Sequence, residues 1–381
     1  MASVKQSRIR RGRRLRWAVV GQGYFAQAAV LPAFSHARST CELTTLFSDD
    51  PRKRSRLGKK YRVRNLLSYD RYDDFLASGE VDAVYIALPN HLHKDYTVRA
   101  ARACVHVLCE KPMAVTEAEC RAMIEACEQA RVKLMIAYRL HFNEANLMAV
   151  DMARRNKLGD IRYFSSVFSL PVKEGNIRTL PTDQGGGPLY DIGIYCINAA
   201  RYLFQAEPSE VIGLAATKTG DDRFARTEEQ VGATMRFPGD RLATFTVSFG
   251  AADIAAYDLL GSKGRLRLDS SYEYAAPMEL LTQIGAKTKK KKFPKRDQIA
   301  PELEYFAGCV MNDQEPEPSG WEGLHDVRII QAILQSIRSE RKMTLDLPDK
   351  PFRPNRRQII ERPPVQKMPS LIHADPPSSG G

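Results

Sequence analysis

The chain has 381 residues, of which 43% are hydrophobic and 27% charged, and its formal net charge is +12. This length is too great for one ordinary core and suits two domains. No apolar run approaches the roughly 20 residues of a membrane-spanning helix, so we expect no membrane segment and no membrane partner.

The positive charge is concentrated in two segments that contain no acidic residue. Residues 5–16 and 287–296 each carry seven Lys or Arg residues, and the remainder of the chain is therefore close to neutral. Runs of this kind are usually solvated and flexible. We expect a disordered basic tail at 1–15, a loop at 287–296, and no nucleic-acid partner, since such charge gives only weak, salt-sensitive attraction.

The seven cysteines include no Cys-x-x-Cys pair, and most lie in predicted helices or strands. They are typical of reduced core thiols, which favours a cytoplasmic protein. The histidines have no metal-ligand spacing, and we expect no metal. The short apolar stretch 16–21 ends at a glycine and does not have the form of an export signal.

Between residues 16 and 138, short apolar runs alternate with helical patterns. Strands are predicted at 16–21, 42–48, 82–88, 105–109 and 133–137, and helices between them at 24–36, 51–60, 70–79, 92–103 and 116–131. This alternation builds a doubly wound parallel sheet. The N-terminal domain, 16–138, is thus predicted to be a Rossmann domain.

After residue 138 the pattern changes to an α+β domain, predicted to span 139–346. Helices are expected at 143–157, 189–204, 300–312 and 322–340, and strands at 160–169, 209–217, 229–237, 241–249, 254–260 and 264–269. Several strands alternate polar and apolar residues, which favours a large, mainly antiparallel sheet with one open face. That face predicts a homo-oligomer, a dimer or a tetramer. Residues 347–381 are predicted to form an extended Pro-rich tail.

A candidate dinucleotide loop follows the first strand and opens a helix. It reads Gly21-Gln22-Gly23-Tyr24-Phe25-Ala26. Gly21 permits a tight turn, Gly23 lets the backbone approach a pyrophosphate, and Ala26 replaces the third glycine of the usual pattern at the helix–strand contact. The alternative is a merely structural turn.

The end of the second strand indicates which nucleotide is bound. An NAD enzyme usually has an acid there to bind the ribose 2′-hydroxyl. This chain has Ser48 instead, with Lys53 and two arginines nearby. A hydroxyl close to cations suits a 2′-phosphate, so we predict NADP, with NAD as the alternative. Asp49 would oppose this if it pointed inward.

Three further segments carry a resemblance to a known family. They are Cys109-Glu110-Lys111-Pro112, the run from Ala137 to Asn143, and Gly185-Gly-Gly-Pro-Leu-Tyr-Asp191-Ile-Gly-Ile-Tyr195. With the glycine loop, they make residues 16–345 resemble the Gfo/Idh/MocA oxidoreductases, and among these the glucose–fructose oxidoreductases most. Inositol-oxidising members have a histidine where this chain has Tyr195, so the resemblance implies a sugar (aldose or related polyol) as substrate. The stretch from Pro171 to Gln184, which should border the sugar, departs from the glucose–fructose pattern.

The chemistry of these residues indicates the same activity without the resemblance. Hydride transfer between a sugar carbon and nicotinamide requires a proton to move at the hydroxyl oxygen. Tyrosine is a poor base at neutral pH, but a neighbouring ammonium favours the phenolate. Asp191 and Tyr195 are four residues apart on one predicted helix face. We assign Tyr195 as proton acceptor, Lys111 as its electrostatic partner and Asp191 as substrate orienter; whether the lysine or the tyrosine is the formal base stays open.

The resemblance also implies supporting residues around the cofactor and substrate. The loop Leu88-Pro89-Asn90 and His93 would line the nicotinamide pocket, and Glu110 would meet the nicotinamide ribose or amide. Tyr138 and Arg139 would reach the cofactor or the substrate, with His141 a lesser candidate. The predicted function is an NADP-dependent sugar oxidoreductase. An NAD-dependent glycosidase and a non-catalytic sensor are alternatives, and the retained Lys/Asp/Tyr set favours the enzyme over the sensor.

Overall fold

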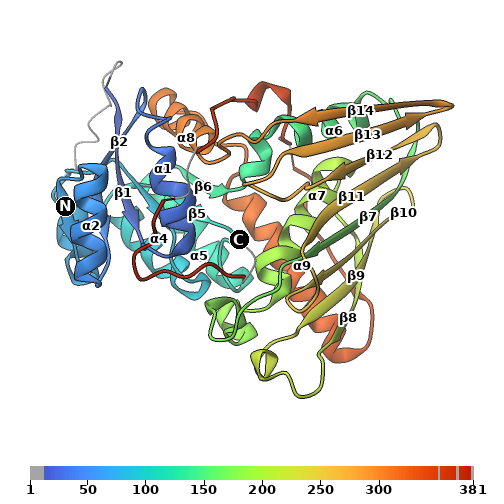
Figure 1. The fold of residues 1–381 in the computed structure, drawn as a ribbon, viewed down its shortest axis with the longest axis horizontal. Helices are drawn as coiled ribbons and strands as arrows, with labels where there is room; N and C mark the ends of the chain where they lie inside the picture. The colour runs from blue at the N-terminus through green and yellow to red at the C-terminus, as the bar shows by residue number, and fades with distance from the viewer. Residues whose placement is uncertain (1–12, 351, 366–368, 379–381) are drawn as a thin grey trace.

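The computed structural model describes residues 13–350, 352–365 and 369–378, and these residues build two sheets that stand side by side (Figure 1). The first is a six-stranded parallel sheet in the order β3-β2-β1-β4-β5-β6. Its strands are β1 (Leu15–Val20), β2 (Cys41–Phe47), β3 (Asn65–Leu67), β4 (Ala83–Ile86), β5 (His106–Glu110) and β6 (Leu134–Ala137). The order reverses between β1 and β4, the crevice where doubly wound sheets bind their ligands. The predicted Rossmann fold is confirmed.

Both faces of this sheet are buried, which explains why its strands are apolar almost throughout. Along β1, Trp17 and Val19 enter one core and Ala18 and Val20 the other. The helices of this half are α1 (Leu31–Ala33), α2 (Pro51–Tyr61), α3 (Tyr72–Ala77), α4 (His93–Arg102) and α5 (Glu117–Ala130). A π-helical segment, Ala26–Val30, precedes α1.

The second sheet is nine-stranded and mixed, in the order β14-β13-β12-β11-β7-β10-β9-β8-β15. Only the β7–β10 pair is parallel among its pairings. The strands are β7 (Ile161–Ser169), β8 (Glu210–Ala216), β9 (Gln230–Phe237), β10 (Arg241–Ser248), β11 (Ile254–Gly261), β12 (Gly264–Asp269), β13 (Met278–Ile284), β14 (Lys287–Phe293) and β15 (Met343–Thr344). The predicted mainly antiparallel sheet is confirmed.

Helices cover one face of this sheet and leave the other open (Figure 1). The covering helices are α6 (Glu144–Arg154), α7 (Ile194–Phe204) and α9 (Gly320–Ser339). A second π-helical segment, Leu189–Gly193, leads directly into α7. Short 3-10 helices lie at Tyr69–Arg71, Asn90–Leu92, Arg139–Phe142, Ile177–Thr179, Thr182–Gln184, Asp222–Phe224 and Arg356–Gln358.

One helix from the C-terminal half returns to the Rossmann sheet. Helix α8 (Ala300–Asn312) lies within the range predicted for the second domain, but its residues join the core on the outer face of the first sheet. The rings of Phe306 and Trp17 are 5.6 Å apart between centroids. A parallel sheet needs cover on both faces, and α8 supplies part of that cover from a distant segment.

The sequence predicts a structure for two basic segments, and the structure describes the second of them fully and the first only in part. The run 287–296 was expected to be a loop, and this is wrong: β14 is an edge strand paired antiparallel with β13. Lysines suit such an edge because they oppose docking by another strand, and Lys290 pairs with Glu279 (3.1 Å). Of the predicted basic tail, residues 1–12 lie outside the described part of the chain. Arg14 contacts Glu42 (3.1 Å) just before β1 begins.

The Pro-rich segment after residue 346 is largely extended but packs along the protein. Gln358 is buried, and Ile372 hydrogen-bonds to Gln27 next to the glycine loop. Among the described helices, none is both long enough and apolar enough to cross a bilayer.

Candidate active site

The predicted site residues gather at the carboxyl edge of the Rossmann sheet. Gly21 follows β1, Pro89 lies beyond β4, Lys111 follows β5 and Arg139 follows β6. Because parallel strands end at the same edge, these loops lie together. Helix α7 of the second half brings Tyr195 to them.

The glycine loop has the geometry that a dinucleotide requires. Gly21 has φ +95°, and a Cβ there would lie 2.4 Å from the carbonyl oxygen of Ala87. A Cβ at Gly23 would meet no atom within 4 Å, so open space lies above the start of the helix. The first N–H groups of a helix have no partner inside the helix and attract phosphate. The loop therefore fits a pyrophosphate.

The aromatic residues after Gly23 contact the second half of the chain. The Tyr24 and Tyr274 hydroxyls are 3.3 Å apart, and the ring of Phe25 lies edge-on to that of Tyr274, with 5.8 Å between centroids. Ala26 is buried where the third glycine of the pattern would stand. The glycine loop thus contacts the second half of the chain through Tyr24 and Phe25 and is buried at Ala26.

At the end of β2, Ser48 is buried and its hydroxyl accepts from the N–H of Asp50 (3.2 Å). Asp49 accepts from the N–H of Tyr69 (3.0 Å), so its carboxylate is engaged by the chain beyond β3. Arg54 donates to the Ser48 carbonyl (2.5 Å), and Lys53 is half-buried beside it. No acid occupies position 48, and cations lie close to it.

Lys111 is the centre of the predicted catalytic set. Its Nζ donates to the Asp191 carbonyl (2.8 Å) and to Asp191 Oδ1 (3.2 Å), and it lies 4.8 Å from the ring centroid of Tyr195. Burial alone lowers the pKa of Lys111, but Tyr195, Asp191 and Glu110 outweigh it, and the pKa is raised above its ordinary value. The side chain is therefore an ammonium at neutral pH.

Two cations lie close to the Tyr195 ring. The Arg139 guanidinium lies 4.9 Å from its centroid, comparable with the distance from Lys111. Arg139 is itself buried: it donates to Gln298 (2.5 Å) and to the Tyr272 carbonyl, while its Nε has no hydrogen-bond partner among the residues that the structure describes. Both cations favour negative charge on the tyrosine oxygen.

Asp191 has a second cationic partner that sequence reasoning missed. Arg178 donates from Nε to Asp191 Oδ2 (2.6 Å), opposite the oxygen that Lys111 contacts. Burial would raise the pKa of Asp191, but Arg178 and Lys111 lower it to about 2. Arg178 lies in the stretch that departs from the family pattern, so no motif identified it. Asp191 lies in the π-helical segment before α7, a backbone feature common at functional sites.

The loop after β4 is held in place by hydrogen bonds to neighbouring segments. His93 is fully buried, with Nε2 2.8 Å from the Leu88 carbonyl and Nδ1 2.9 Å from the Pro112 carbonyl. It therefore ties this loop to the one that carries Lys111. Asn90 donates to the Gly185 carbonyl (2.7 Å) and so joins the two halves. Pro89 occupies the N-cap position of the 3-10 helix that follows, without a side-chain hydrogen bond.

Two carboxyl groups, the half-buried Glu110 and the fully buried Glu302, lie near the site. Glu110 accepts from the Tyr85 hydroxyl (2.5 Å), and burial raises its pKa. Glu302, on α8, has neither oxygen partnered within the described protein. Burial, with Glu110 nearby, raises the pKa of Glu302 well above its usual value. Sequence reasoning did not identify Glu302.

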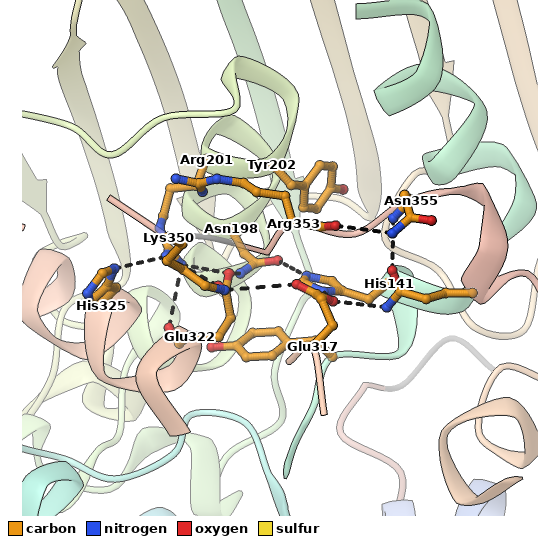
Figure 2. A network of polar contacts seen from close by, with 12 residues as sticks. His141, Asn198, Arg201, Tyr202, Glu317, Glu322, His325, Lys350, Arg353 and Asn355 are labelled. Atoms are coloured by element: carbon orange, nitrogen blue, oxygen red, sulfur yellow. Dashed lines mark hydrogen bonds and ion pairs between the residues drawn. The ribbon is translucent and has the colours of Figure 1, made fainter. Parts of the chain in front are cut away.

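Two residues predicted to reach a ligand face a buried polar network instead. The Tyr138 hydroxyl donates to Asp326 (2.6 Å). His141 lies 2.7 Å from Glu317 and 2.8 Å from Asn198 through its two ring nitrogens (Figure 2). Because Asn198 lies one turn after Tyr195 on α7, this network supports the helix that carries the site.

Comparison with known proteins agrees with this geometry. Residues 15–138 match the model of an oxidoreductase family with an NAD-binding Rossmann fold, and residues 147–267 match the GFO/IDH/MocA C-terminal domain. The fold and site therefore define a two-domain oxidoreductase with a dinucleotide-binding Rossmann domain. The chain belongs to the Gfo/Idh/MocA family.

Named relatives are similar along most of their length. D-xylose 1-dehydrogenase [NADP(+)] of Haloarcula marismortui is 32% identical over 87% of this chain and 93% of its own. An aldose–aldose oxidoreductase from Caulobacter crescentus, solved with glycerol, is 34% identical, with TM-score 0.83 and coverage of 87% and 100%. A 3-ketoreductase from Actinomadura kijaniata, solved with NADP, is 26% identical, with TM-score 0.77 and coverage of 85% and 98%. The comparisons give no support to the glycosidase or the sensor.

Proposed function

We propose that the protein is an NADP-dependent oxidoreductase of aldoses that acts at the anomeric carbon. The observation that carries the proposal is the Tyr195 ring, which lies 4.8 Å from the ammonium of Lys111 and 4.9 Å from the guanidinium of Arg139, with Asp191 one turn earlier. A relative that oxidises D-xylose with NADP and a solved relative named for two aldoses support the substrate class.

In this scheme the chain's residues handle the proton of the sugar hydroxyl. Asp191, ionised and fixed by Arg178 and Lys111, accepts a hydrogen bond from a sugar hydroxyl and orients the ring. Tyr195 takes the proton of the hydroxyl that is being oxidised, and Lys111 and Arg139 stabilise the charge on its oxygen beforehand. The nicotinamide supplies the hydride acceptor when bound. The sugar loses one hydride and one proton and leaves as a lactone.

NADP rather than NAD is proposed from the end of β2. The residue that would bind a free 2′-hydroxyl in an NAD enzyme is Ser48, and its neighbour Asp49 is engaged by Tyr69. Of the basic residues that follow, Lys53 is half-buried and near enough along the chain to meet a 2′-phosphate. The glycine loop residues from Gly21 to Ala26 would hold the pyrophosphate.

A substrate panel tests the proposal. The purified protein is given D-xylose, D-glucose and myo-inositol, each with NADP or NAD, and reduced nicotinamide is followed by absorbance. We expect aldose-dependent reduction with a higher kcat/KM for NADP. Cofactor binding without reduction by any aldose would overturn the enzyme proposal.

We further propose a cytoplasmic homo-oligomer, a dimer or a tetramer, with domains at 16–138 and 139–346. All seven cysteines are free thiols, which supports a reducing compartment. The open face of the second sheet exposes large apolar side chains, which supports an interface there: Ile212, Leu214, Leu242 and Ile254. Light scattering of the purified protein distinguishes a monomer from either oligomer.

A further inference from the structure

A C-terminal segment lies against the cofactor end of the Rossmann domain. Residues 369–378, here called the strap, reach it at Gln27, one turn beyond Gly23. The amide of Gln27 pairs with the backbone of Ile372 twice, donating to its carbonyl (2.9 Å) and accepting from its N–H (2.8 Å). The same Gln27 amide also donates to the carbonyl of Gln22 (2.9 Å) in the glycine loop. The strap is therefore joined to the loop that fits the pyrophosphate.

A second contact lies where the adenosine end of a dinucleotide is expected. Nδ1 of His373 is 2.6 Å from Oδ2 of Asp50. Asp50 lies two residues beyond Ser48 and caps helix α2 through the N–H groups of Arg52 and Lys53. The strap thus touches both the pyrophosphate loop and the segment that distinguishes NADP from NAD.

A third contact takes the strap to the other half of the protein. The carbonyl of Pro377 accepts from the N–H of Lys173 (3.0 Å). Lys173 lies in the segment after β7 that leads to Arg178 in the active site. The strap therefore connects the Rossmann half with the substrate half, and in Figure 1 it runs from beside α1 toward the centre of the molecule.

The chain before the strap is fixed by the buried network of Figure 2. Lys350 lies against the Glu322 carboxylate, and Arg353 pairs with Glu207 (2.9 Å). Further along, Gln358 donates to Glu317 (3.0 Å). These side chains are largely buried, so the strap is tethered close to its binding position and the entropic cost of closing it is small.

We propose that the strap forms part of the dinucleotide site, together with the glycine loop and the segment after β2. It covers the adenosine end of the bound cofactor and slows the release of the cofactor between turnovers. The inference rests on the proposed function, since it concerns the same cofactor. Three contacts carry it: the paired hydrogen bonds of the Gln27 amide with Ile372, the hydrogen bond between His373 and Asp50, and the hydrogen bond from Lys173 to the Pro377 carbonyl. None of the three uses a side chain of the catalytic set, so a change in the release of the cofactor can be measured separately from a change in sugar oxidation.

The test is the rate at which NADPH leaves the protein. NADPH fluorescence is followed after addition of excess NADP, for the full chain, for a chain lacking 369–381, and for a control lacking only 379–381. We expect release about tenfold faster without the strap, which corresponds to about 1.4 kcal/mol, and no change in the control. Unchanged release, or tighter binding after deletion because the strap competes with the cofactor, would overturn the proposal.

Point variants carry the test if the deletion does not fold. His373→Ala removes the hydrogen bond to Asp50, and Asp50→Asn takes away the carboxylate that makes it while keeping a good helix cap. Each is expected to speed release about threefold, as for an exposed polar contact, and the double variant no more than either one. Additive effects would show that the two residues act separately and would contradict the strap. Sugar oxidation with NADP in excess should persist in all of them; its absence in the full chain would instead refute the proposed function.

Discussion

The ammonium of Lys111 should account for a large part of the rate. Replacing it with methionine keeps the length and apolar stem of the side chain and removes the charge 4.8 Å from the Tyr195 ring centre. With an effective dielectric constant of ~20, two unit charges at this distance interact by about 3.5 kcal/mol. Tyr195 must carry its negative charge before it accepts the proton of the sugar hydroxyl. Without the ammonium, forming that charge costs this much more, so kcat should fall about 300-fold.

The measurement is kcat at saturating aldose and NADP, with the dissociation constant for NADPH measured separately by fluorescence. We expect the affinity for NADPH to change much less than kcat, because the lost interaction is with the charged Tyr195 and not with the nucleotide. Lys263→Met, an exposed lysine in the turn between β11 and β12, is the matched control. A Lys111→Met enzyme that keeps kcat within tenfold of the parent would refute the electrostatic reasoning.

Three further changes test other parts of the site. Tyr195→Phe removes the oxygen that accepts the proton, and kcat should fall by ~10²–10⁴ while NADPH still binds; ordinary turnover would contradict the assignment. Ser48→Asp puts an acid beside the 2′-phosphate, so the ratio of kcat/KM for NADP to that for NAD should fall at least ~10-fold; an unchanged ratio places the phosphate elsewhere. Because the folded protein raises the pKa of Glu302 well above its ordinary value, stability should decline by up to about 1.4 kcal/mol per pH unit between the ordinary glutamate pKa and the raised one. Urea unfolding of Glu302→Gln at pH 5 and pH 8 should lack this decline; equal pH dependence in both proteins would argue against it.

The strongest sequence predictions came from segments whose pattern is dictated locally. The parallel strands are buried on both faces, so they read as continuous apolar runs, and β4 was located to within two residues at each end. Helix α2 begins at Pro51 after a capping Asp50, and α5 has a capping box at Thr116. Such signals require only a few neighbouring residues.

The missed elements depend on distant partners. Strand β3 has three half-buried residues, and β14 reads Lys-Thr-Lys-Lys-Lys-Lys-Phe, with no alternation. Each is a strand because an existing sheet edge offers it hydrogen bonds. Arg178 was missed for a similar reason: it meets Asp191 through the fold of a segment that carries no motif. The strap contacts Gln27 across 345 residues of sequence, which no local pattern encodes.

The charges around each candidate support Tyr195 as the group that takes the proton. The raised pKa of Lys111 leaves it without a lone pair at neutral pH, and both of its hydrogen bonds are donated to Asp191. Asp191, with a pKa of about 2, is too weak a base to hold a proton from a sugar hydroxyl. The Tyr195 oxygen is the remaining acceptor of the set. We infer that the two cations stabilise the negative charge that Tyr195 carries before it accepts the proton, and that Asp191 orients the sugar.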